Sequence, residues 1–164
     1  MSYILYINDL DNVVTNGIVE SIQQYDDIAI IPNVTYESHS DIFKRLSTTI
    51  SEKDVKYIVG TYNGGLLGYY LSNLYKIPAL LFNPLMDDYL KLIPRTAKNV
   101  LFFEKKIIVF GNSINAEKML GILPKMYSDD YIKIIDDKLD YDIQIDKFDN
   151  YFKKFMEWFR DDII

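Results

Sequence analysis

Tyr57-Ile58-Val59-Gly60-Thr61-Tyr62-Asn63-Gly64-Gly65 is the stretch that decides the fold, and it runs directly into residues 66–75. An apolar run stops at a glycine, the chain turns through small residues, and apolar positions then recur at helical spacing: Leu67, Tyr70, Leu71 and Leu74. Because glycine permits close backbone approach, the stretch predicts a buried strand, a sharp turn and an amphipathic helix.

Further apolar runs of strand length lie on both sides of this unit: Tyr3–Ile7, Ile28–Ile31, Val55–Gly60, Pro78–Phe82, Ile107–Phe110 and Tyr131–Ile135. Helical patterns separate them, and a last helix carries an aromatic stripe over Phe148–Phe159. Pro94–Glu104 is expected to be an irregular excursion that covers the site. The alternation predicts a single domain over residues 1–164, a three-layer α/β sandwich with a parallel sheet between helices.

The composition excludes several classes of protein. Of 164 residues, 49% are hydrophobic and 15% aromatic, so we expect a folded domain with a substantial core. The net charge of −6 disfavours nucleic acid and anionic membrane as partners, because phosphate binding needs a basic face. The absence of cysteine excludes disulfides and thiolate metal sites. No apolar run approaches membrane-spanning length and no signal peptide pattern is visible, so a cytoplasmic location is expected. The abundance of isoleucine, asparagine and lysine is typical of low-GC bacteria and their phages.

Sites in parallel sheets form where the strands end, at their carboxyl edge. That edge is predicted to collect Asn8-Asp9, Thr61-Tyr62-Asn63, Asn83, Asn112-Ser113 and the loop 140–143. Any binding or chemistry is expected there.

With these residues assembled, the chain resembles the small YqiA/YcfP-type esterases, a bacterial branch of the α/β-hydrolase superfamily. The resemblance is carried by Ile58-Val59-Gly60, Gly64-Gly65, Leu71-Ser72, Pro78-Ala79 and Asn83-Pro84. Weaker matches at Ile4–Ile7, Ile30-Ile31-Pro32 and Phe148–Phe159 extend it over nearly the whole chain. It implies six parallel strands in the order 2-1-3-4-5-6. It also implies that Gly60-Thr61-Tyr62-Asn63-Gly64 corresponds to the G-x-S-x-G nucleophile turn.

The catalytic residues of that family do not carry over. Tyr62 stands at the nucleophile position, Asn112 at the position of the acid, and Tyr141–Ile143 lack the expected histidine. The His-Gly that would follow the first strand reads Asn8-Asp9. A tyrosine, whose ordinary pKa is about 10, would need a nearby base or cation to act as nucleophile, and none lies close to it along the chain. The lone histidine, His39, follows the second strand, and we interpret it as a loop residue.

A rival interpretation starts from Asp9-Leu10-Asp11, which resembles the D-x-D motif of haloacid dehalogenase-like phosphatases. In this interpretation Thr61 would correspond to the phosphate-binding threonine of that family, and either Lys98 or Lys105 to its conserved lysine. Its magnesium-binding G-D-S-x-x-D motif here reads Gly111-Asn112-Ser113-Ile114-Asn115-Ala116, so both acids are replaced. Magnesium needs oxygen ligands and usually several carboxylates. The alternative is a structural role, in which Asp9 and Asp11 cap the following helix.

The sequence therefore predicts a catalytically inactive α/β-hydrolase-like protein, a pseudo-esterase that acts as a binding or protein-interaction module. No catalytic residue, metal or cofactor is expected. The predicted pocket residues are Asn8, Asp9, Thr61, Tyr62, Asn63, Asn83 and Asn112, and the expected partner is a protein or a second copy of the chain. The alternative is a hydrolase of altered chemistry, using Tyr62 on esters or Asp9 and Asp11 on phosphate esters.

Overall fold

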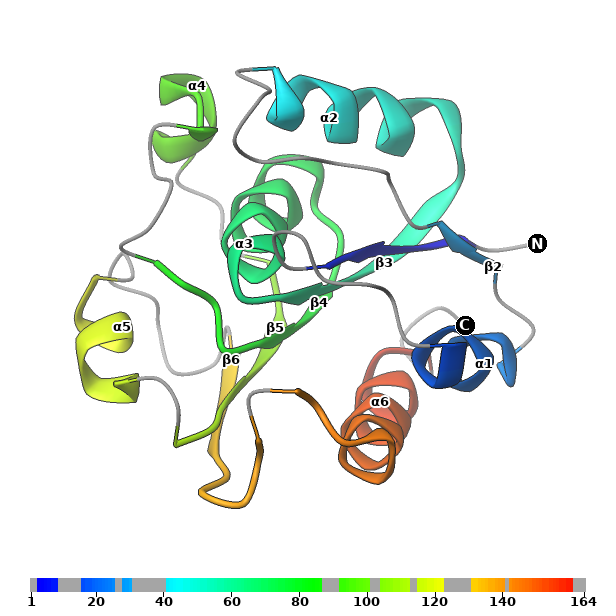
Figure 1. The fold of residues 1–164 in the computed structure, drawn as a ribbon. Coiled ribbons are helices and arrows are strands. Elements are labelled where there is room, and N and C mark those ends of the chain that lie inside the picture. Colours follow the sequence, from blue (N-terminus) through cyan, green and yellow to red (C-terminus); the bar gives the residue numbers. More distant parts are fainter. Residues whose placement is uncertain are drawn as a thin grey trace.

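The computed structural model describes residues 3–8, 16–25, 28–30, 41–86, 92–100, 104–112, 115–122, 131–140 and 142–160. Within these ranges, six strands form one parallel sheet in the order β2-β1-β3-β4-β5-β6 (Figure 1). The strands are β1 (Tyr3–Ile7), β2 (Ile28–Ile30), β3 (Val55–Thr61), β4 (Ala79–Phe82), β5 (Lys106–Phe110) and β6 (Tyr131–Ile135). Their carboxyl ends therefore lie along one edge of the sheet.

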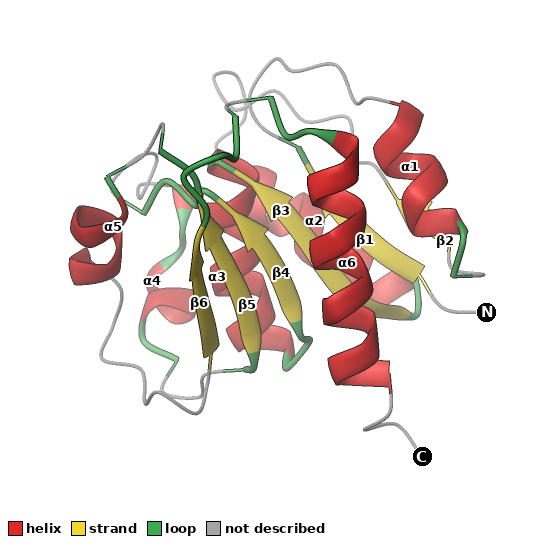
Figure 2. Cartoon of the chain, turned by 90° about the horizontal axis from the view of Figure 1, so that it is seen from below, coloured by secondary structure: helices red, strands yellow, loops and turns green. Residues whose placement is uncertain are grey.

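Helices cover both faces of this sheet. Two of them, α1 (Asn16–Gln23) and α6 (Ile145–Arg160), lie on one face (Figure 2). The opposite face carries α2 (Ile42–Glu52) and α3 (Asn63–Tyr75), and the short α4 (Arg95–Lys98) packs against α3. The remaining helix, α5 (Ala116–Ile122), contributes Met119 to the core on the side of α2 and α3. The predicted α/β arrangement, a parallel sheet between two helical layers, is confirmed.

Each face of the sheet has its own hydrophobic core. Ile58 points to the α2 and α3 side, and its neighbour Val59 points to the α6 side, because successive side chains of a strand alternate between faces. All five residues of β5, Lys106–Phe110, are buried, as expected for a strand covered on both sides. The outermost strand, β6, differs, because Ile132 and Ile135 are 41% and 59% exposed.

The aromatic stripe of α6 explains why this helix docks on the sheet. Phe148 and Phe152 are fully buried, and their rings are stacked 5.5 Å apart. Phe82 of β4 lies 5.6 Å from Phe148, so the ring of a strand residue meets the rings of the helix. Burying one such side chain contributes about 2 kcal/mol, which makes this stripe the main attachment of α6.

Some expected boundaries need correction. The segment 94–104 was predicted to be irregular, but Arg95–Lys98 form a helical turn and Ala97 is buried. Strand β3 extends one residue beyond the predicted Gly60, to Thr61, and β5 begins at Lys106 rather than Ile107. Helix α3 begins at Asn63. Asp9, Asp11, His39, Ser113 and Tyr141 lie outside the described residues. Among the described helices, none is both long and apolar enough to cross a bilayer.

Candidate functional site

The turn between β3 and α3, centred on Tyr62, is a sharp strand-to-helix elbow. Tyr62 adopts φ 52° and ψ −114°, a conformation that costs a non-glycine residue about 1–3 kcal/mol. The carbonyl oxygen of Tyr62 accepts hydrogen bonds from the backbone N–H of Leu66 at 3.0 Å and of Leu85 at 3.2 Å. The surrounding backbone therefore holds the strained residue in place.

Close backbone approach explains the glycines on either side of Tyr62. A Cβ atom on Gly64 would lie 2.0 Å from the carbonyl oxygen of Ile7, and one on Gly60 would lie 2.4 Å from that of Gly64. Both contacts involve backbone atoms, which cannot swing aside as a flexible side chain does. These glycines are therefore required because the start of α3 lies against the backbone of β1 and β3.

The side chain of Tyr62 is nevertheless buried, with 2% of its surface exposed. Its hydroxyl oxygen accepts a hydrogen bond from Nδ2 of Asn83 at 3.3 Å. Asn83 is itself fully buried, and its Oδ1 accepts a hydrogen bond from the backbone N–H of Gly111 at 2.7 Å. A neutral carboxamide, supplied from the end of β4, is therefore one hydrogen-bonding partner of the Tyr62 hydroxyl.

Asn83 joins the ends of three neighbouring strands. Its φ of 47° lies in the left-handed region, which asparagine tolerates better than most residues. Its backbone N–H donates to the carbonyl oxygen of Val109 at 2.8 Å, while its side chain reaches both Tyr62 after β3 and Gly111 after β5. Asn83, which precedes Pro84 in the sequence, therefore connects the ends of β3, β4 and β5. The sequence analysis placed Asn83 at this edge of the sheet but did not identify its partners.

Asn8 and Thr61 meet at the ends of β1 and β3. Oδ1 of Asn8 accepts hydrogen bonds from the hydroxyl of Thr61 at 3.3 Å and from that of Tyr6 at 3.4 Å. Thr61 is 3% exposed, so its hydroxyl serves this contact within the fold. The structure therefore brings Asn8 and Thr61 together as predicted, in an arrangement that aims two hydroxyl groups at an amide oxygen.

The other predicted positions are used differently. Asn63, 4% exposed, begins α3 beneath the elbow. Asn112 is exposed, and its Nδ2 donates to the backbone carbonyl of Asp137 at 2.9 Å, which ties the end of β5 to the turn after β6. Asp9 and Tyr141 lie outside the described residues.

A charged cluster after β6 was missed by the sequence analysis. Oδ2 of Asp136 accepts hydrogen bonds from Nζ of Lys147 at 2.8 Å and from the hydroxyl of Tyr151 at 2.6 Å. These two contacts, Lys147 first, lower the pKa of Asp136 from 3.8 to about 2. Burial, followed by the nearby carboxylate, raises the pKa of Tyr151. The cluster therefore holds a stable carboxylate and a firmly protonated phenol, and it fastens α6 to the end of β6.

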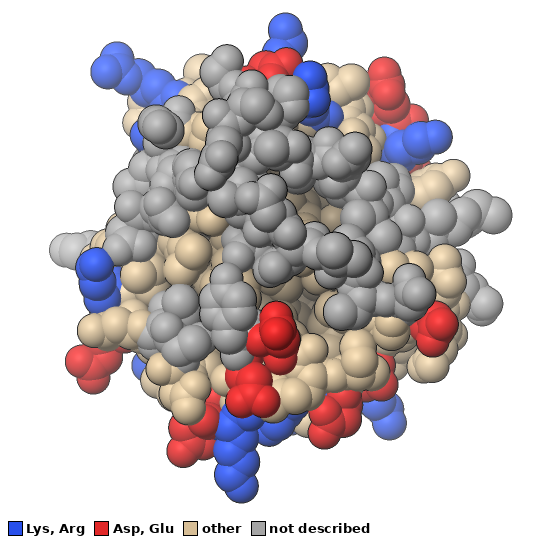
Figure 3. Space-filling view, in the orientation of Figure 1, with Lys and Arg blue, Asp and Glu red and all other residues tan. Residues whose placement is uncertain are grey.

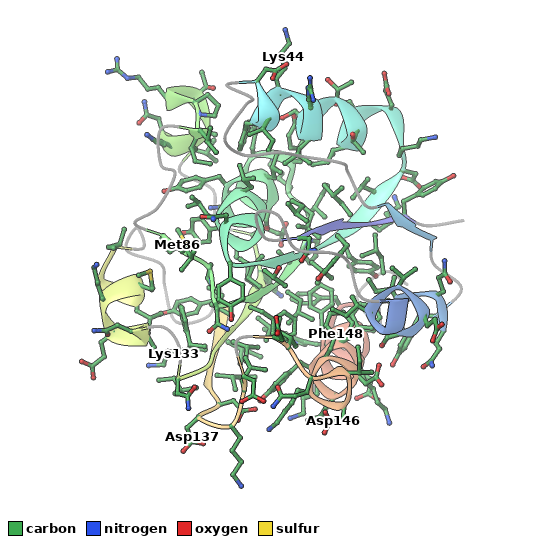
Figure 4. The ribbon with its side chains drawn as sticks, viewed as in Figure 1. Lys44, Met86, Lys133, Asp137, Asp146 and Phe148 are labelled. Atoms are coloured by element: carbon green, nitrogen blue, oxygen red, sulfur yellow. The ribbon has the colours of Figure 1, made fainter. Side chains whose placement is uncertain are left out.

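Charge on this side of the molecule is mainly acidic near the cluster. Figure 3 views the carboxyl edge, and acidic side chains gather in its lower half. Asp137 and Asp146 are both exposed and extend outward there (Figure 4). Over the described part of the chain, no group of three or more His, Cys, Asp or Glu side chains is placed to hold a metal ion.

The lysine proposed for the phosphatase interpretation is partly tested. Lys105 precedes β5 and so lies at the amino edge of the sheet, opposite the edge at which Asn8 follows β1. Lys105 is therefore separated from the ends of β1 and β3, where Asn8 and Thr61 lie. Lys98 lies in the last turn of α4.

Comparison with protein-family profiles gives a match over most of the chain. The profile of the uncharacterised protein family UPF0227 matches residues 18–163, which includes β2 to β6 and the whole elbow. No curated protein gives a significant match. Because the match covers most of the sequence, the chain belongs to the uncharacterised protein family UPF0227.

Proposed function

We propose that this protein is a catalytically inactive relative of YqiA/YcfP-type esterases, which retains the α/β-hydrolase elbow and acts as a binding or protein-interaction module. The observation that carries the proposal is the state of Tyr62. It occupies the strained position of a nucleophile, yet it is 2% exposed and its described side-chain partner is the amide of Asn83.

The chemistry of these groups argues against turnover. A nucleophile in an elbow needs a base within hydrogen-bond reach and a route for substrate to its oxygen. The carboxamide of Asn83 cannot remove a proton from the phenol of Tyr62, and the Tyr62 side chain is 2% exposed, so little of it is accessible to a substrate. Asn112, at the position of the acid, supplies no charge to orient a base.

The polar side chains at the ends of β1 and β3 bond to one another. Catalysis of acyl transfer needs preorganised donors that point at the developing negative charge. Here the side-chain oxygen of Asn8 accepts hydrogen bonds from Thr61 and Tyr6, so two donors at this edge are directed at the protein itself. The polar groups are used to hold the strand ends together.

An interaction role draws support from the sheet edge at β6. In the described part of the chain, β6 has a strand neighbour on one side, and its Ile132 and Ile135 are large exposed apolar side chains. Exposed apolar side chains on an edge strand are typical of surfaces that pair with another chain. We therefore place the interaction surface at β6 rather than in the buried elbow.

The test is hydrolysis of p-nitrophenyl acetate, butyrate and phosphate, each with and without magnesium, by the wild type beside Tyr62→Phe and Asp9→Asn. We expect no rate above that of buffer for any of the three proteins. Esterase activity that disappears in Tyr62→Phe would show that the elbow still works with a new nucleophile. Magnesium-dependent phosphatase activity that disappears in Asp9→Asn would support the rival phosphatase chemistry. Light scattering of the wild type and Ile135→Lys over a concentration series tests self-association through β6.

A further inference from the structure

β6 is the last strand of the sheet, and part of its backbone faces away from the neighbouring strand. The backbone N–H of Asp136 donates to the carbonyl oxygen of Phe110 at 2.8 Å, so residue 136 directs its polar backbone groups at β5. These groups alternate in direction along a strand, and those of Lys133 and Ile135 therefore point outward. In the described part of the chain, β5 is the single strand neighbour of β6. The outer edge of β6 thus offers donors and acceptors to another strand.

The side chains at the end of this edge combine one exposed isoleucine with one charge of each sign. Ile135 is 59% exposed, more than any other large apolar side chain that the structure describes. Lys133 lies two residues before it and Asp137 two residues after it, and both are exposed. Among the described residues, neither of these two side chains takes part in an ion pair. The edge therefore carries a cation and an anion at equal spacing on the two sides of Ile135.

This charge order is complementary to a second copy of the same edge. A lysine on an edge strand ordinarily discourages pairing with another chain. In an antiparallel pair with its two-fold axis at Ile135, however, Lys133 of each copy lies opposite Asp137 of the other. Opposite charges that face each other stabilise a strand pair, and like charges destabilise it. An axis at Lys133 would set two lysines against each other, so the charges favour the axis at Ile135.

We propose that the protein forms a two-fold symmetric homodimer in which β6 pairs antiparallel with β6 of a second copy. The inference rests on the interaction role proposed above and specifies its partner. Ile135 meets its own copy at the axis, and a Lys133–Asp137 ion pair lies on each side of it. Interfaces between identical copies are most often two-fold and self-complementary. One pair of short strands buries less than the roughly 1,600 Å² of a standard interface, so we expect a dissociation constant on the order of 100 μM.

Sedimentation equilibrium tests whether the wild type dimerises, over a series from about 10 μM to about 1 mM that brackets this constant. The mean mass is expected to rise from that of the monomer toward that of the dimer. Amide hydrogen exchange, followed by NMR at both ends of the series, tests the strand pairing itself. The amides of Lys133 and Ile135 should exchange more slowly at high concentration. The amide of Asp136 is the internal control, because it is already bonded to Phe110 in the monomer.

Two charge-reversal variants test the register of the pair. Lys133→Glu sets a carboxylate against Asp137, and Asp137→Lys sets an ammonium group against Lys133. Each should weaken dimerisation about tenfold or more, because both ion pairs of the dimer become repulsive. In an equal mixture of the two variants, a heterodimer has both pairs attractive again, so the mean mass should rise toward that of the wild type. The matched control is Lys44→Glu, the same reversal on an exposed position of α2 away from β6 (Figure 4), which should dimerise as the wild type does.

The proposal is overturned by a wild type that stays monomeric throughout the series, which would leave the edge of β6 to a partner of different sequence. It is equally overturned if the two charge variants associate as tightly as Lys44→Glu, or if mixing them does not raise the mean mass. Circular dichroism of each variant verifies that the protein is folded. Failure of these tests leaves the inactive elbow unaffected, whereas ester hydrolysis that is lost in Tyr62→Phe would remove the pseudo-esterase and leave the dimer standing.

Discussion

Replacing Gly64 by alanine should destabilise the fold strongly, because the elbow leaves no room for one methyl group. The added Cβ would lie 2.0 Å from the carbonyl oxygen of Ile7 and 2.8 Å from that of Asn8. Both neighbours are backbone atoms of the segment that ends β1, so relief requires β1 and α3 to separate. Overpacking of a core usually costs about 1–3 kcal/mol, and a clash with fixed backbone belongs at or above the upper end, about 3 kcal/mol.

The assay is thermal unfolding followed by circular dichroism, with Trp158 fluorescence as a second probe. For a domain of this size, 1 kcal/mol corresponds to about 2–4 °C, so Gly64→Ala should lower Tm by about 6–12 °C. Gly121→Ala is the matched control, because a Cβ atom there meets nothing within 4 Å and alanine favours the helix. That control should raise Tm by about 1–4 °C. A Tm for Gly64→Ala within a degree of the wild type would refute the close approach of β1 and α3.

Other predictions concern the polar contacts of the carboxyl edge. Asn83→Ala should lower the free energy of unfolding by about 3 kcal/mol, since it strains a left-handed residue and leaves the N–H of Gly111 without its acceptor. The free energy of unfolding of Asn83→Gly should fall by about 1 kcal/mol less than that of Asn83→Ala, because glycine adopts the left-handed conformation without strain. Equal decreases for the two variants in urea titrations would show that the left-handed backbone of residue 83 does not affect stability. Tyr151→Phe should cost about 1.5 kcal/mol by removing a hydrogen bond to a carboxylate. Because the pKa of Asp136 is about 2 when folded and 3.8 ordinarily, its contribution is complete above about pH 5 and is lost as the pH falls through 2. Asp136→Asn should flatten that part of the stability profile, and an unchanged acid limb would count against the cluster.

The periodicity of apolar residues predicted the sheet and its two helical layers, because this pattern depends only on which side chains are buried. Apolar runs such as Ile107–Phe110 are buried on both faces, and the stripe Phe148–Phe159 is the buried side of α6. The glycines around Tyr62 were equally informative, since a glycine marks where backbones touch. The periodicity of apolar residues could not predict that Lys106, a charged residue at the start of β5, is fully buried. Its Nζ reaches Oδ1 of Asn73 and the carbonyl oxygen of Glu104, partners that come from α3 and the preceding loop.

Contacts between distant segments account for the rest of what the sequence left open. The side-chain partners of Asn83 lie just after two other strands, and nothing in the local sequence pairs an asparagine with Gly111. In the sequence, Asp136 belongs to an acidic segment that is typical of a solvated loop. Its partners, Lys147 and Tyr151, come from the next helix, so the local sequence does not show the cluster.

The measurement that tests the central claim most directly is the steady-state rate of p-nitrophenyl butyrate hydrolysis by the wild type and Tyr62→Phe at matched concentration. A buried phenol held by the amide of Asn83 predicts that both proteins hydrolyse the ester at the rate of buffer alone. A wild-type rate well above buffer that falls to the buffer rate in a folded Tyr62→Phe would contradict the claim and make Tyr62 a working nucleophile.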